Sequence, residues 1–72
     1  MKKISVSLSG HQTSITLEPE FIEALHALSM RMGRPVAQII NEIDATRGTD
    51  KNLSSAVRVW VLNQMILRIA QN

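Results

Sequence analysis

Three polar side chains at alternating positions are the best candidates for a binding chemistry in this chain. They are Gln12, Ser14 and Thr16, and they alternate with apolar residues that include Ile15 and Leu17. Since successive side chains of a strand point to opposite faces, burial of Ile15 and Leu17 would turn the three polar side chains outward. A glutamine can make two hydrogen bonds to the edge of adenine, and a serine or threonine hydroxyl can bond to several bases. The pattern equally fits an ordinary solvated strand face, so base contact is one of two interpretations.

Groups that attract phosphate are the next candidates. Lys2, Lys3 and Arg34 could each neutralise a phosphate, and every such contact makes binding more sensitive to salt. The backbone N–H groups of Val36 and Ala37, at the start of a predicted helix, could hold a phosphate without any side chain. Terminal and loop charges also serve solubility alone, and for Lys2 and Lys3 both interpretations stay open.

Other kinds of chemistry have little support in the sequence. The chain has no cysteine, and it contains neither a phosphate-binding loop nor a serine, histidine and acid at suggestive spacing. The two histidines, His11 and His26, have no second metal ligand at a useful distance along the chain. We therefore expect no catalysis, no metal and no cofactor.

The binding candidates lie in an N-terminal strand region, residues 3–17. Apolar residues alternate with polar ones over 3–8 and again over 12–17, and this period of two predicts strands. Ser9 and Gly10 between the two stretches are a turn or bulge signal. The stretches could form a hairpin or one long kinked arm, and the sequence does not decide between them.

Three helices are predicted after the strands, over residues 19–32, 35–46 and 53–70. Pro19 suits a first helical position, because the N–H that proline lacks would have no partner there. Gly33 suits the left-handed residue that ends a helix, and Asn52 is a good N-cap. Residues 46–51 are the one long polar stretch and are predicted to form a loop.

The amount of apolar surface predicts more than one copy of the chain. A chain of 72 residues forms a single domain, residues 1–72, and a core this small usually needs support from disulfides, a metal or oligomerisation. Residues 53–70 are apolar on several faces, more than one such chain can bury. A lone strand would also leave its backbone groups unpaired, and pairing with a second copy would satisfy them. The predicted dimer core contains Ile15, Leu17, Phe21, Leu25, Ile39, Ile40, Ile43 and Trp60.

Charge and hydropathy indicate the compartment and the class of partner. The formal net charge of +2 allows nucleic-acid binding without demanding it. No stretch has the length of a transmembrane helix, and residues 1–6 alternate where a signal peptide would be continuously apolar. We expect a cytoplasmic protein that does not contact a membrane.

Several segments resemble the ribbon-helix-helix fold of the Arc/MetJ type. The segments that carry this resemblance are Thr13–Phe21, Gly33–Val36 and the pair Ile39-Ile40. A closer likeness, to a bacterial subfamily of short stand-alone ribbon-helix-helix domain proteins, rests on Gly10–Ser14, Glu18–Phe21, Ile43-Asp44 and Asn52–Val59. The resemblance covers nearly the whole chain.

The resemblance implies a mainly α dimer with a short N-terminal β-ribbon and, in this chain, an additional C-terminal helix. It implies a transcriptional regulator whose ribbon residues contact bases in the major groove of double-stranded DNA, while the second helix holds a phosphate at its N-terminus. The chain departs from the family pattern where Ser14 and Thr16 are short, and where Pro35 and Ala37 replace a phosphate-binding hydroxyl or amide. The alternative is a dimeric interaction module, antitoxin-like or an adaptor, whose C-terminal helix docks a protein partner. Pairing of dimers into tetramers stays open.

Overall fold

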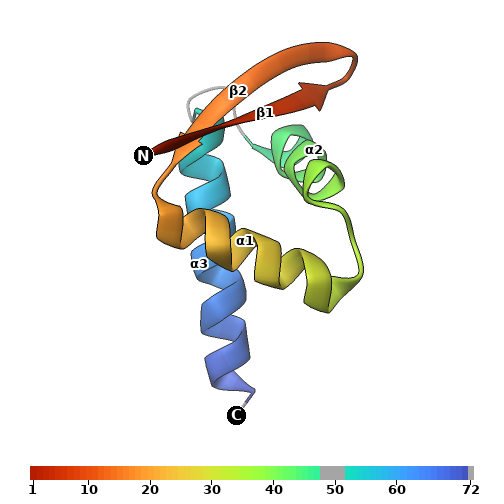
Figure 1. Cartoon of the computed structure of the whole chain (residues 1–72). Helices are drawn as coiled ribbons and strands as arrows, with labels where there is room; N and C mark the ends of the chain where they lie inside the picture. The colour runs from red at the N-terminus through yellow and green to blue at the C-terminus, as the bar shows by residue number, and fades with distance from the viewer. Residues whose placement is uncertain (48–51, 72) are drawn as a thin grey trace.

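A two-stranded antiparallel sheet followed by three helices forms the fold, in a computed structural model that describes residues 1–47 and 52–71 (Figure 1). The elements are β1 (Lys2–Leu8), β2 (His11–Leu17), α1 (Pro19–Met32), α2 (Val36–Thr46) and α3 (Leu53–Ala70). In Figure 1 the sheet lies at one end, and α3 runs from beside the sheet past α1 to the opposite end. Among the described helices none is long and apolar enough to cross a membrane.

The two strands form a hairpin, which decides between the alternatives that the sequence left open. Ser9 and Gly10 both have positive φ, 49° and 84°, and this suits a two-residue turn of type I′. The pairing runs from Leu8 opposite His11 to Lys2 opposite Leu17. The premise that the second strand lacks a partner within one chain is therefore wrong, and strand pairing alone does not demand a second copy.

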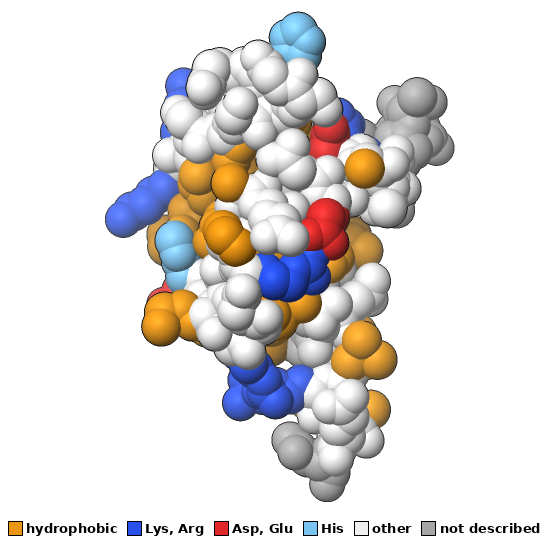
Figure 2. Space-filling model, turned by 90° about the vertical axis from the view of Figure 1, so that its right-hand side faces the viewer, with side chains coloured by type: hydrophobic (Ala, Val, Ile, Leu, Met, Phe, Trp, Pro, Cys, Tyr) orange, Lys and Arg blue, Asp and Glu red, His pale blue; other side chains and the backbone are white. Residues whose placement is uncertain are grey.

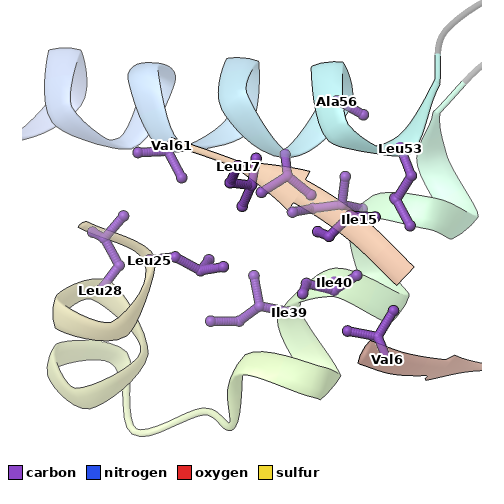
Figure 3. Packing of buried hydrophobic residues seen from close by; sticks show 12 residues of the cluster. Val6, Ile15, Leu17, Leu25, Leu28, Ile39, Ile40, Leu53, Ala56 and Val61 are labelled. Atoms are coloured by element: carbon purple, nitrogen blue, oxygen red, sulfur yellow. The ribbon is translucent and has the colours of Figure 1, made fainter. Parts of the chain in front are cut away.

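The core lies between the inner face of the hairpin and the three helices (Figure 3). Of the eight predicted core residues, Phe21 and Trp60 are half-buried against this cluster, whereas the other six are buried. The buried side chains are Val6, Ile15, Leu17, Leu25, Leu28, Ile39, Ile40, Ile43, Leu53, Ala56, Val57 and Val61. They form the core of a single chain, with every element contributing at least one side chain.

Local signals explain where the helices begin and end. Pro19 is the first residue of α1, and Gly33 ends that helix with a left-handed φ of 66°. The side-chain oxygen of Asn52 accepts a hydrogen bond of 2.8 Å from the N–H of Ser55, as expected of an N-cap. α2 begins at Val36, one residue later than predicted, because Pro35 has an extended backbone. Residues 48–51 of the predicted loop lie outside the described residues.

Candidate nucleic-acid interface

One face of the hairpin points away from the helices, and we call it the outer face. Directly opposed residues of two antiparallel strands share a face, so the register pairs Lys3 with Thr16, Ser5 with Ser14 and Ser7 with Gln12 on that side. All six side chains are exposed. The structure thus brings Gln12, Ser14 and Thr16 together on one polar surface and places Lys3 beside them.

The inner face explains why the outer face has its orientation. Ile15 and Leu17 are 4% and 0% exposed, and they alternate with the three exposed polar residues of β2. Lys2 stands opposite Leu17 and therefore has the register of the inner face, where it lies exposed at the end of the sheet. The two lysines that the sequence treated alike consequently belong to different faces.

Ser5 and Ser7 are members of the outer face that the sequence did not single out. Their place depends on the hairpin, since a kinked arm would not have set them opposite Ser14 and Gln12. The available signal was the turn: two residues suited to positive φ, between two alternating stretches, favour a tight hairpin.

The start of α2 is tied to the turn end of the hairpin. The side-chain amide of Asn41 donates hydrogen bonds of 2.8 Å to the carbonyl oxygens of Ser7 and Ala37. Ala37 is exposed and Val36 is half-buried. The first N–H groups of a helix have no partner within the helix, and they lie at its positive end. This predicted phosphate site therefore lies near the end of the outer face that carries Gln12.

The start of α3 lies against the other edge of the hairpin. The hydroxyl oxygen of Ser54 accepts a hydrogen bond of 3.3 Å from the backbone N–H of Thr16, a residue 38 positions away in the chain. Sequence reasoning missed this contact, because no local pattern connects two residues so far apart. As a result, the N-termini of two helices flank the hairpin, α2 beside β1 and α3 beside β2.

Most arginines near this surface already have carboxylate partners. Arg34, predicted to contact phosphate, forms an ion pair with Glu42, which competes with that role. Arg58 binds the carboxylate of Glu18 at 2.8 Å, and this hydrogen bond lowers the pKa of Glu18 below its ordinary value of 4.5. Lys2 and Lys3 have no ion pair among the described residues, so they are the cations free to meet phosphate at the hairpin.

The histidines do not add a metal site to this surface. His11 lies exposed at the start of β2 beside the turn, and His26 is exposed in α1. Within residues 1–47 and 52–71 there is no group of three or more histidines or carboxylates that could hold a metal ion.

A β-ribbon followed by two helices, with polar side chains on the ribbon's outer face, defines a known class of small domain. The ribbon-helix-helix domain model matches residues 1–65, and the chain belongs to this family. Domains of this class are generally DNA-binding regulators or antitoxins, typically dimerise, and have a fold that is not an enzyme's. No curated protein and no solved structure matches the chain. The family match ends within α3, so the last turns of that helix lie outside it.

Proposed function

We propose that this protein binds double-stranded DNA as a homodimer and regulates transcription in the cytoplasm. The observation that carries the proposal is the outer face itself, a two-stranded surface of six exposed polar side chains without an apolar residue. A two-stranded ribbon has the width of the DNA major groove, where side chains can reach base edges.

The contacts divide into two kinds. Gln12, Ser14 and Thr16 would contact base edges, with Gln12 able to make two hydrogen bonds to adenine. Lys2 and Lys3 would contact phosphates, which position a protein on the duplex without selecting a sequence.

The helix starts would add further phosphate contacts. The N–H groups of Val36 and Ala37 point from the positive end of α2, beside the hairpin edge that Asn41 holds. The start of α3, held near Thr16 by Ser54, is a second candidate of the same kind. Arg34 would contribute less than the lysines, because Glu42 already neutralises it.

The short side chains of the outer face predict how affinity and specificity divide. Four of the six are serine or threonine, so few long side chains are available for direct base contacts. We expect discrimination to come mainly from Gln12 and from DNA shape, and affinity from the cations and helix starts.

A binding titration at several salt concentrations tests the proposal, using DNA selected from a random pool. Lys3→Ala should weaken binding to all sequences and flatten the plot of log K against log salt by about 0.9, the loss of one phosphate contact. Gln12→Ala should relax specificity more than affinity. Arg31→Ala, which removes an exposed cation from α1, is the matched control and should leave both unchanged. Absence of DNA binding by the wild type even at low salt would refute the proposal.

A second candidate function is a protein-interaction module, antitoxin-like or an adaptor. The observation that favours it is a set of exposed aliphatic side chains on α3, among them Leu62, Ile66 and Ile69. Apolar docking depends weakly on salt, whereas DNA binding depends on it strongly, so the same titration separates the two candidates.

A further inference from the structure

One side of α3 carries aliphatic side chains that the chain itself does not cover. The residues of this helix that are buried in the core are Leu53, Ala56, Val57 and Val61. On the other side Val59, Leu62, Ile66 and Ile69 follow one another at intervals of three, four and three residues, and we call them the α3 stripe. Their exposed fractions run from 44% for Val59 to 74% for Ile69. An alternating three-and-four spacing is that of a seam between two helices.

An apolar groove adjoins the stripe at Leu62. It lies between α1 and α3, has a volume of about 200 Å³, and is lined by Glu20, Phe21, Ala24, Val61, Leu62 and Met65. A cavity of about 150 Å³ is large enough to hold a benzene molecule, so this groove has room for an aliphatic side chain from outside. The stripe and the groove together form one continuous apolar surface.

This surface lacks the charges that an exposed helix normally carries. The 18 residues of α3 include two charged ones, Arg58 and Arg68, and neither belongs to the stripe. Arg58 is already paired with Glu18. Figure 2 shows hydrophobic side chains on the end of α3 that extends below the body of the molecule. Contiguous exposed apolar surface of this kind marks an interaction site.

We propose that the α3 stripe packs antiparallel against the α3 stripe of a second copy of this chain. In this arrangement Leu62 lies against Ile66 of the second copy, and Val59 lies against its Ile69. The proposal rests on the homodimer in the proposed function and names the surface that forms it. The outer face of the hairpin stays free, because it lies on the hairpin and not on α3.

Self-pairing is favoured because the stripe is complementary to itself. Both of its halves carry one pair of branched aliphatic residues, so a twofold axis between Leu62 and Ile66 places similar side chains against each other. Two such stripes can meet without burying a charge, and this avoids the main energetic cost of a helix interface.

The charges beside the stripe favour the antiparallel direction. A parallel pair would bring the Arg68 side chains of the two copies to the same level. An antiparallel pair places Arg68 level with Trp60 of the other copy, within about a turn of the groove where Glu20 lies. Neither Glu20 nor Arg68 has an ion pair among the described residues, and opposed helix dipoles add to the preference.

Sedimentation equilibrium without DNA tests whether the stripe joins two copies. At tens of micromolar the particle mass of Leu62→Lys/Ile66→Lys should be half that of the wild type, with an unchanged circular dichroism spectrum. The milder Leu62→Ala/Ile66→Ala should weaken self-association at least about tenfold, as for central interface residues. Met30→Lys is the matched control, because Met30 is 85% exposed and lies outside the stripe, so it should keep the wild-type mass. A monomeric wild type, or a mass that the stripe variants do not change, would overturn the proposal.

Cysteine cross-linking tests the direction, since the chain has no cysteine of its own. A mixture of Leu62→Cys and Ile66→Cys should form a mixed disulfide faster than either variant forms one with itself. Faster cross-linking of Leu62→Cys to itself would overturn the antiparallel arrangement. Failure of DNA binding together with a halved mass would refute the proposed function and leave this interface standing. DNA binding by a stripe variant that keeps the wild-type mass would do the reverse.

Discussion

The outer face of the hairpin and the α3 stripe are both exposed, yet they differ in chemistry. The outer face carries hydroxyls, an amide and one ammonium group, whereas the stripe carries aliphatic groups. Strand alternation leaves polar residues on the side away from the core, as in an ordinary half-buried ribbon. α3 has apolar residues on both sides and can bury one of them within its own chain.

The contrast teaches that exposure alone does not identify a functional surface, because the two surfaces suit different partners. Polar groups that stay in water cost nothing until a nucleic acid replaces the water. Exposed aliphatic groups are unfavourable until another apolar surface covers them. Four substitutions test this division, from the one that should destroy both surfaces to the one that should barely alter either.

The largest effect is expected from Leu17→Lys. Leu17 is 0% exposed between the hairpin and the helices, and a lysine there would bury an unpaired charge. That penalty is comparable with the whole stability of a small domain, about 5–15 kcal/mol, so the protein should unfold and lose both surfaces. Circular dichroism at 25 °C measures this. Thr16→Lys, at the neighbouring exposed position, should remain folded, and Ile15→Lys should behave like Leu17→Lys. A folded Leu17→Lys protein would contradict the assignment of the inner face.

A smaller loss of stability is expected from Trp60→Ala in α3. Truncation of a buried tryptophan costs about 3–5 kcal/mol, and since Trp60 is half-buried we expect a value near or below the lower end of that range. Urea unfolding measures the change, and Val59→Ala at the adjacent exposed position should cost less. A loss as large as that of Leu17→Ala would mean that another surface covers Trp60 in solution.

Gly10→Val should weaken the hairpin and leave α3 intact. Gly10 has a φ of 84° and nothing within 4 Å of its position for a Cβ atom, so the cost is conformational, about 1–2 kcal/mol. Amide hydrogen exchange should show faster opening of β1 and β2, with unchanged protection in α3. Ser9→Asn is the control, because asparagine tolerates the positive φ found there. Equal loss of protection in both regions would show that they open as one unit.

The smallest effect is expected from Glu18→Gln, which removes the link between the start of α1 and α3. The hydrogen bond from Arg58 lowers the pKa of Glu18 in the folded protein, so ionised Glu18 stabilises the fold above the ordinary pKa of 4.5. This contribution is lost as the pH falls through the lowered pKa. Thermal unfolding should show a slightly lower Tm for the variant at pH 7, and the gap should close in strong acid. Glu23→Gln should match the wild type at both pH values, and a gap that widens in acid would contradict the assignment.

Much of the fold follows from patterns that are local in the sequence. Alternation around Ile15 and Leu17 determined which side of the second strand faces the core, because a shift of one residue would expose both. Pro19, Gly33 and Asn52 determined helix ends, because each satisfies or avoids backbone hydrogen bonds within one turn.

Contacts between distant residues were decided only by the tertiary structure. The hairpin, and with it the separation of Lys2 from Lys3, depends on how two strands align. The hydrogen bond from Thr16 to Ser54 depends on where α3 begins in space. The sequence showed that α3 is apolar on several faces, but periodicity does not state which face its own chain will cover. That choice is made by packing, which buried Val57 and Val61 and left Leu62 and Ile66 exposed.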